Sequence, residues 1–283
     1  MCSKEKRTRK YRDTLMAMIK THVGTMFLHK ASRSTAVCAV VAIVVCCLLA
    51  VGTASCGNGS QHSQDTAKPP VAKRDTTALY DGIDISSHQG NIDWQQVATD
   101  KFIRFAYIKA SEGATYQSPH YAYNVANARK HGILVGSYHY LRSSSTIREQ
   151  FLNFTRMAKV GDQDLIPMID IEKRGSWSRR ELIDSLTEFA NLIQAHYGVQ
   201  PMIYSTMTFY NHNLAPYFNK YPLYIGRYSD RKPEIMWDGK FTIWQFSERG
   251  VVPGIDAYVD LCHYHDGGWL DEIELPKPVP LSS

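Results

Sequence analysis

Two periodicities of apolar and polar residues divide the chain between residues 79 and 263 into short and long segments. Short apolar-rich runs, in which alternate side chains share a face, predict β-strands. Stretches with apolar residues every three or four positions predict helices. Strands are predicted at residues 80–86, 103–110, 133–140, 165–171, 202–205, 223–227, 241–246 and 258–262. Helices are predicted at residues 94–99, 119–130, 146–160 and 178–197.

The helix at residues 178–197 has the clearest boundaries of the four. Ser178 is a typical N-cap, Glu181 completes a capping box three residues later, and Gly198 follows the last turn. The apolar stripe of this helix consists of Leu182, Leu186, Phe189 and Ile193. Such a stripe predicts one buried face.

The order of these segments predicts an α/β fold. The first five strands alternate with helices, which favours parallel pairing, whereas little helix separates the last three. Eight strands of this kind favour an irregular TIM-like (β/α) barrel over an open sheet. The barrel domain is placed at residues 79–270, followed by a C-terminal tail at residues 271–283. In such barrels the active site lies at the carboxyl ends of the strands.

A segment of different composition precedes the barrel. Residues 36–51 are all apolar, with Lys30 and Arg33 before them and small residues after them. This order describes a secretory signal, and the apolar run is also compatible with a membrane anchor. Met26 makes a better start for such a signal than Met1, because the segment before it is long. Residues 57–78 are polar and lack periodicity, which predicts a flexible linker.

Cys56 ends the N-terminal segment at residues 1–56. Small residues followed by Cys after an apolar run resemble the bacterial lipoprotein box, in which the cysteine is lipidated, although Thr53 replaces the usual aliphatic residue. We predict a lipoprotein tethered to a membrane of the cell envelope. A plain cleaved signal, which would give a secreted or periplasmic domain, and an uncleaved anchor are the alternatives.

The positive charge of the chain is concentrated at its N-terminus. Of the 32 lysines and arginines nine lie in residues 1–35, together with two of the 27 acidic residues. The remainder therefore has 23 basic and 25 acidic residues and lacks the basic patch typical of nucleic-acid binding. Cys262 is the one cysteine in the predicted barrel, which excludes an internal disulfide and a Cys-based metal cluster there. We expect a monomer without metal or cofactor.

Asp170 and Glu172 form the most informative pair in the chain. They lie two positions apart at the end of an apolar run, so in a strand they would share a face about 6–7 Å apart. Carboxylates at the end of a buried strand are unfavourable unless they have partners or a function. Paired carboxylates are the working groups of glycoside hydrolysis.

Other polar and aromatic residues fall at the same ends of the predicted strands. They are Asp84, Lys109, Glu112, Tyr138, Tyr204, Trp244, Gln245 and Asp260. Tyrosine and tryptophan rings at a strand end are suited to stack on sugar rings, but in strands they are more often core residues. His139 alternates with Tyr138, so one of the two faces out of the barrel.

Several motifs together resemble glycoside hydrolase family 25, the Chalaropsis-type lysozymes. They are GIDIS at 82–86, IKASEG at 108–113, GSYHY at 136–140, DIE at 170–172, WQF at 244–246, PGI at 253–255 and VDL at 259–261. The resemblance covers residues 79 to about 263. It implies a (β/α)5(β)3 barrel that cleaves the β-1,4 bond between N-acetylmuramic acid and N-acetylglucosamine in peptidoglycan.

The resemblance also implies roles for the acids. Glu172 would be the general acid/base, and Asp170 the nucleophile or the group that stabilises the substrate's acetamido group, with retention of configuration. Asp84 and Asp260 would complete the catalytic set. In the loop before Asp260 the chain departs from the family pattern, which leaves Asp256 as a competitor for that place.

The remaining candidates would bind the glycan. Tyr138, Tyr204, Trp244 and Gln245 would contact sugar rings. Lys109 and Glu112 would pair with each other or with Asp84.

Two other interpretations compete with a muramidase. A chitinase-like amino-sugar hydrolase would use the same DIE triplet, but it needs a further Asp at the position of Met168. A non-catalytic carbohydrate-binding barrel is a second alternative, although every acid that catalysis needs is present.

Overall fold

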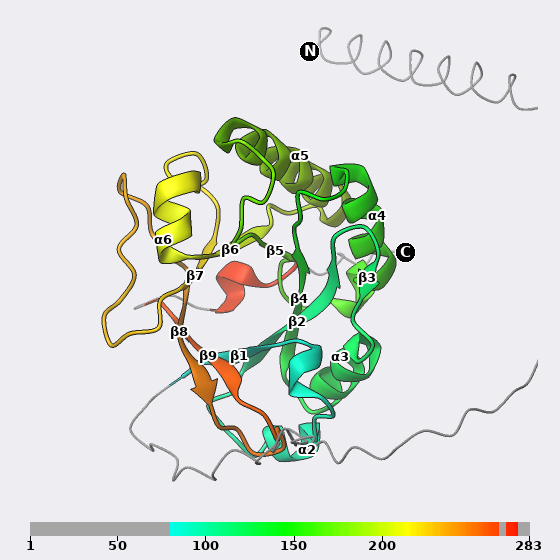
Figure 1. Cartoon of the computed structure of the whole chain (residues 1–283). Helices are drawn as coiled ribbons and strands as arrows, with labels where there is room; N and C mark the ends of the chain where they lie inside the picture. Colours follow the sequence, from blue (N-terminus) through cyan, green and yellow to red (C-terminus); the bar gives the residue numbers. More distant parts are fainter. Residues whose placement is uncertain (1–79, 266–269, 277–283) are drawn as a thin grey trace, which may run out of the picture. The chain divides into compact units, whose positions relative to one another are not determined.

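A computed structural model describes residues 80–265 and 270–276 (Figure 1). The predicted signal, the lipidation site Cys56, the linker and residues 277–283 of the predicted tail lie outside these residues. Among the helices of the described ranges, none is long and apolar enough to cross a membrane.

Eight strands close into a barrel. The sheet order is β1-β9-β8-β7-β6-β5-β4-β2-β3, and an additional pairing of β1 with β2 closes the ring. The ninth strand, β3, is a two-residue strand that pairs with the end of β2. The strands are β1 (Gly82–Ile85), β2 (Phe105–Glu112), β3 (Tyr116–Gln117), β4 (Leu134–Tyr140), β5 (Met168–Asp170), β6 (Met202–Thr206), β7 (Leu223–Gly226), β8 (Ile243–Gly250) and β9 (Val259–Tyr264).

Pairing is parallel from β1 through β2, β4, β5, β6 and β7 to β8, and β9 is antiparallel to both of its neighbours. Only residues 251–258 connect β8 to β9, and such a short connection suits a hairpin rather than a parallel crossover. The predicted irregular TIM-like barrel is thereby confirmed.

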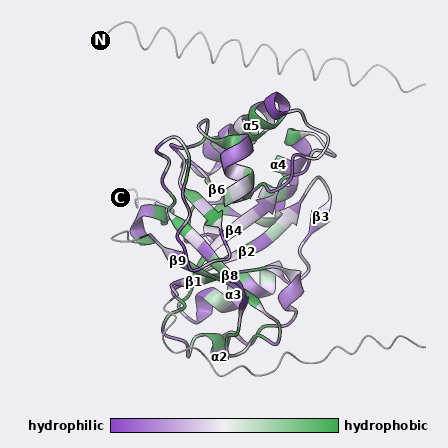
Figure 2. Cartoon of the chain, turned by 60° about the vertical axis from the view of Figure 1, so that its left-hand side comes forward, coloured by the Kyte–Doolittle hydropathy of each residue, from purple (hydrophilic) through white to green (hydrophobic). Residues whose placement is uncertain are grey.

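Helices cover part of the outside of the barrel. The longer ones, α3, α4 and α5, lie beside the strands from β2 to β6 (Figure 1). They carry both polar and apolar residues (Figure 2). The helices and helical turns are η1 (Ser87–Gln89), α2 (Trp94–Val97), α3 (Tyr121–Lys130), α4 (Ile147–Met157), η2 (Val160–Asp162), α5 (Arg179–Tyr197), α6 (Met207–Phe209), η3 (Tyr210–Leu214) and η4 (Leu270–Ile273).

Helix α5 follows its sequence signals closely. The Ser178 hydroxyl accepts a hydrogen bond from the backbone N–H of Glu181, and the Glu181 carboxylate accepts one from the N–H of Ser178. Gly198 ends the helix in the left-handed conformation at φ 78°, which glycine adopts without steric cost. The whole predicted apolar stripe of this helix is buried.

The first part of the predicted strand at 165–171 pairs instead with the C-terminal segment. The N–H of Ile166 donates to Ile273 O and the N–H of Leu275 to Asp164 O, both at 2.8 Å. Ile273 is fully buried in this contact. Residues 270–276 therefore belong to the barrel, and the domain extends beyond the predicted boundary at residue 270.

Candidate active site

Strand β5 and the residues directly after it position Asp170 and Glu172. Asp170 is its last residue and lies between Tyr140 of β4 and Tyr204 of β6 in the sheet register. The N–H of Ile171 donates to Tyr204 O at 3.0 Å, which keeps the next residues extended beside β6. Asp170 is 6% exposed, whereas Glu172 is only partly buried.

Both carboxyl groups of this pair hold a proton more tightly than an exposed acid. Burial and then the charge of Glu172 raise the pKa of Asp170 well above its ordinary value, and Lys109 acts against this. Burial also raises the pKa of Glu172, opposed by Lys173 and Lys109. One Asp170 oxygen, Oδ1, is buried and has no hydrogen-bond partner among the described residues. That lack adds to the cost of ionising Asp170.

Asp84 and Asp260 form a second pair, across the seam between β1 and β9. They lie opposite each other in the sheet register. The competitor Asp256 is exposed on the loop before β9, so the geometry favours Asp260.

Burial dominates the electrostatics of this second pair as well. Burial and the charge of Asp260 raise the pKa of Asp84 well above its ordinary value. Burial is also the main reason that the pKa of Asp260 is raised from 3.8 to about 6.

Gln245 connects Asp84 to two tyrosines, and a third tyrosine bonds Asp84 directly. Its Oε1 accepts hydrogen bonds from the hydroxyls of Tyr204 at 2.7 Å and Tyr228 at 2.9 Å, and its Nε2 donates to Asp84 Oδ2. The hydroxyl of Tyr224 donates to the same Asp84 oxygen at 2.9 Å. Because Oε1 accepts both hydroxyls, the amide has a single orientation, with Nε2 toward Asp84.

Sequence reasoning missed two of these tyrosines. Tyr224 is in a predicted strand, two residues before Gly226, and only the alternation of side chains could have placed it on the inner face. Tyr228 follows that strand and belongs to none of the recognised motifs.

Tyr138 lies within electrostatic reach of all four acids. Burial raises its pKa, and the charges of Asp84, Asp170, Asp260 and Glu172 raise it further. The predicted convergence of acids on one end of the barrel is therefore present in the structure.

His139, rather than its neighbour Tyr138, faces out of the barrel. Its ring packs against Phe154 of α4 and Phe189 of α5, and its Nδ1 lies 2.8 Å from the hydroxyl oxygen of Ser111. Burial lowers the pKa of His139 to about 4, so it is neutral at physiological pH.

Trp244 does not have the position that a sugar-stacking residue needs. It alternates with Gln245 on β8, so the two side chains lie on opposite faces of the strand. Its ring packs against Phe246 and His263, its indole N–H donates to Arg227 O at 2.8 Å, and 7% of it is exposed. The structure thus places Trp244 outside the site.

Lys109 and Glu112 pair with each other, which was one of the two predicted arrangements. Lys109 Nζ lies 2.6 Å from Glu112 Oε2, and Arg142 Nε lies 2.7 Å from Glu112 Oε1. Arg142 was not among the predicted residues, because nothing in the sequence relates it to Glu112, 30 positions earlier.

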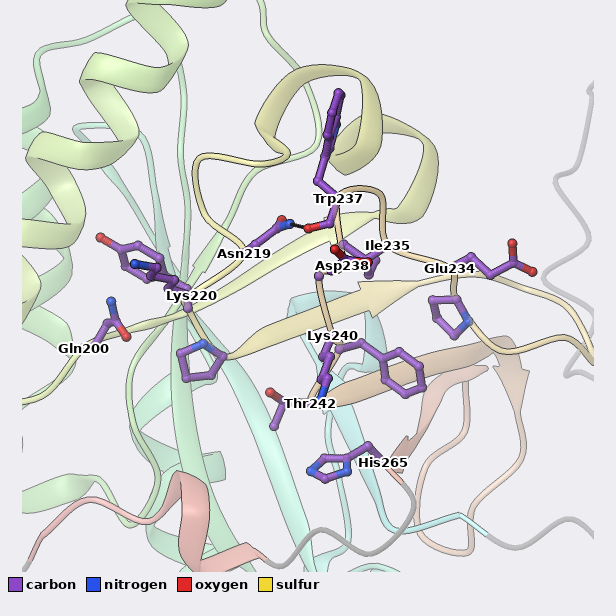
Figure 3. Close-up of a pocket in the computed structure, with 15 residues that line it drawn as sticks. Gln200, Asn219, Lys220, Glu234, Ile235, Trp237, Asp238, Lys240, Thr242 and His265 are labelled. Carbon is purple, nitrogen blue, oxygen red and sulfur yellow. Dashed lines mark hydrogen bonds between the residues drawn. The ribbon is translucent and has the colours of Figure 1, made fainter.

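An open hollow of about 960 Å³ lies elsewhere, at the amino ends of β6, β7 and β8. Gln200, Pro222, Thr242 and His265 line it, and Asn219 beside it binds the carbonyl of Trp237 at 2.9 Å (Figure 3). None of the predicted site residues borders this hollow. Its position at the amino ends of the strands separates it from the acids.

Comparison with known families agrees with the arrangement of the acids. The family described as "Glycosyl hydrolases family 25" matches residues 83–255. The chain belongs to glycosyl hydrolase family 25. Family membership identifies it as a glycoside hydrolase.

Relatives of this family 25 enzyme include bacterial proteins. The uncharacterized protein YegX of Escherichia coli K12 is 37% identical over 198 residues, which are 68% of this chain and 71% of YegX. The autolytic lysozyme of Clostridium acetobutylicum is 31% identical over 186 residues, which are 66% of this chain and 56% of that protein. A family 25 glycosyl hydrolase from Bacillus anthracis has a similar structure, with a TM-score of 0.62, 27% identity and coverage of 71% and 94%.

The raised pKa of Asp260 predicts how stability varies with pH. Between the ordinary pKa of 3.8 and the folded value of about 6, Asp260 binds a proton more often in the folded enzyme than in the unfolded chain. The contribution of Asp260 to the free energy of unfolding therefore falls as the pH rises through this range. We expect the substitution Asp260→Asn to abolish this decrease in the free energy of unfolding, which is on the order of 1–2 kcal/mol. The variant should therefore be more stable than the wild type at about pH 7.

Urea unfolding at about pH 4 and about pH 7 measures this difference. Asp230→Asn, at an exposed acid outside the cluster, is the matched control and should leave the pH dependence unchanged. Equal pH dependence in Asp260→Asn and the wild type would contradict the expected cost of the buried pair.

Proposed function

We propose that this family 25 enzyme hydrolyses the β-1,4 bond between N-acetylmuramic acid and N-acetylglucosamine in peptidoglycan, with retention of configuration. The observation that carries the proposal is the cluster of Asp84, Asp170, Glu172 and Asp260 around Tyr138. The relatives named as lysozymes support the choice of peptidoglycan as substrate.

Glu172 is proposed as the general acid and base. The acid must reach the oxygen of the scissile bond, and Glu172 is more exposed than Asp170. Burial raises its pKa, which keeps part of the population protonated for donation to the leaving group. After the bond breaks, the same carboxylate would take a proton from the incoming water.

Asp170 is proposed to orient the substrate's 2-acetamido group rather than to attack the sugar. A carboxylate nucleophile must be ionised, and burial and Glu172 both oppose the ionisation of Asp170. The acetamido oxygen of the substrate avoids this requirement, because it attacks the anomeric carbon as a neutral group. A hydrogen bond from the acetamido N–H to Asp170 would hold that oxygen in place and favour the charge that develops on the group.

The Asp84–Asp260 pair is proposed to support this step indirectly, through its negative charge. Gln245 and Tyr224 both donate hydrogen bonds to one oxygen of Asp84. The charges of both aspartates act on Tyr138, and the charge of Glu172 acts on Asp260, which supports an electrostatic role for the pair. A fixed negative charge there would favour a positively charged transition state.

The first test is Glu172→Gln, which keeps the size of the side chain and removes the transferable proton. We expect at least a hundredfold loss in the rate at which peptidoglycan releases reducing ends, since general acid catalysis contributes about 10²–10⁴-fold. Thermal stability should stay close to that of the wild type, because Glu172 is only partly buried. Glu188→Gln on the exposed face of α5 is the matched control.

Persistent activity in Glu172→Gln would show that another group is the acid. Release of products from chitin but not from peptidoglycan would favour the chitinase-like alternative, against which Met168 stands two residues before Asp170. Binding of peptidoglycan without any cleavage by the wild type would favour the carbohydrate-binding barrel.

The second test separates the two routes to retention. A substrate whose muramic acid residues are N-deacetylated lacks the acetamido oxygen, so we expect its cleavage to fall at least a hundredfold, on the order of one lost catalytic group. Mass spectrometry of the enzyme during turnover is the complementary measurement. A covalent glycosyl adduct on Asp170, or undiminished cleavage of the deacetylated glycan, would establish Asp170 as the nucleophile.

We further propose that Cys56 carries a lipid that tethers the enzyme to a membrane of the cell envelope. The support is the apolar run and the small residues before Cys56. Cys56→Ala should move the full chain from the membrane fraction to the soluble fraction of cells, because the acyl chains supply the membrane affinity. Unchanged membrane association would instead indicate an uncleaved anchor.

A further inference from the structure

The basic residues around the proposed site are concentrated on one of its two sides, which also carries the acids Glu112, Asp170 and Glu172. Four basic residues, which we name the basic rim, border β2, β4 and β5: Lys109, Arg142, Lys173 and Arg174. Strands β1, β8 and β9 on the other side contain three acidic residues and one arginine, which are Asp84, Glu248, Asp260 and Arg249. A ligand with an anionic substituent would therefore bind best with that substituent over β4 and β5.

Two connections that carry the basic rim are bonded to each other. The N–H of Ser176, after β5, donates to the hydroxyl of Ser143, after β4, at 3.0 Å. At the base of these connections the N–H of Leu141 donates to Asp170 O at 2.8 Å. Arg142 and the Lys173–Arg174 pair are thus parts of one surface at the carboxyl end of the barrel.

This surface lies within electrostatic reach of the reacting groups. Lys109 and Lys173 both lower the pKa of Glu172, and Asp170 contributes to the raised pKa of Arg142. Two cations lie near the ring of Tyr140, with Lys109 Nζ 5.0 Å and the Arg142 guanidinium carbon 4.8 Å from its centroid. A glycan cleaved at Glu172 would therefore have its neighbouring substituents beside the basic rim.

One acid neutralises only part of the rim. Glu112 binds both Lys109 and Arg142, and 45% of the Arg142 side chain is still exposed. The side chains of Lys173 and Arg174 are exposed and make no hydrogen bond or ion pair within residues 80–265 and 270–276. The rim therefore keeps a net positive charge that faces solvent.

The next two arginines along the chain differ in this respect. Arg179 donates to the carbonyl oxygens of Asn213 and Ala215, and Arg180 pairs with Asp184 at 3.6 Å. These contacts give both arginines a role in the fold, and we leave them out of the rim.

We propose that the basic rim binds the carboxylate groups of the peptide stems that muramic acid residues carry. This inference rests on the proposed function and narrows its substrate class to peptidoglycan whose stem carboxylates are free. Lysine and arginine form charge-assisted hydrogen bonds with carboxylates, and the lactyl group of muramic acid would bring the stem next to the cleaved bond. Amidated stems or glycans without stems would lack this contact.

The test compares two substrates and two double variants of the full chain. The substrates are peptidoglycan with free stem carboxylates and the same material after chemical amidation of those carboxylates. The test variant is Lys173→Gln with Arg174→Gln. The matched control is Lys130→Gln with Lys240→Gln, which removes the same charge from exposed lysines away from the acids.

We expect the wild type and the control to cleave the unmodified substrate about three- to tenfold faster than the amidated one, since each exposed ion pair contributes a small factor. The test variant should cleave both at the slower rate. The preference should also shrink as salt rises from about 0.05 M to about 0.5 M, because the screening length falls to a few ångströms. Exchanging the two residues as Lys173→Arg with Arg174→Lys should retain the preference.

Several results would overturn the inference. Equal rates of the wild type on both substrates would mean that stem carboxylates are not recognised. A preference that survives in the test variant, whose folding is verified by its melting temperature, would place recognition elsewhere. If the control variant lost the preference for the unmodified substrate to the same extent, the preference would depend on the overall charge of the protein and not on the basic rim. A wild type that cleaves neither substrate would instead refute the proposed function itself.

Discussion

The interior of this barrel has to accommodate buried carboxyl groups. Asp84 and Asp170 are each less than one-tenth exposed, and Asp260 and Glu172 lie beside them. Ionising several such groups at once in a weakly polar interior is strongly unfavourable. The neighbouring side chains meet this constraint with hydrogen bonds from Tyr224 and Gln245 to Asp84 and with the charge of Lys109, which lowers the pKa of Asp170.

This constraint connects the closure of the barrel to its chemistry. Asp84 and Asp260 lie opposite each other where β9 inserts antiparallel between β8 and β1, so two acids meet at the seam of the barrel. The aromatic rings of Tyr107, Tyr204 and Tyr224 pack edge to face next to this pair. Among them, Tyr224 donates its hydroxyl to Asp84, and Tyr204 donates to Gln245, which in turn donates to Asp84.

The exposed edge of the site carries positive charge, in contrast to the interior. Lys109 and Arg142 both lie near the ring of Tyr140 and both pair with Glu112, so their charges are held in place by ion pairs and a ring. Lys173 and Arg174 are exposed without such partners. The interior therefore limits negative charge, while the rim over β4 and β5 presents positive charge to a substrate.

The sequence by itself determined the order of the strands and helices, the capped helix α5 and three of the four acids, because these depend on periodicities and motifs that are local. Only the tertiary structure decided which residues meet. It joined Asp84 to Asp260, brought Tyr224 and Tyr228 into the site, turned Trp244 away from it, and added residues 270–276 to the barrel. These outcomes depend on strand register and on which face of a strand a side chain takes, and both are set by contacts between segments far apart in the chain.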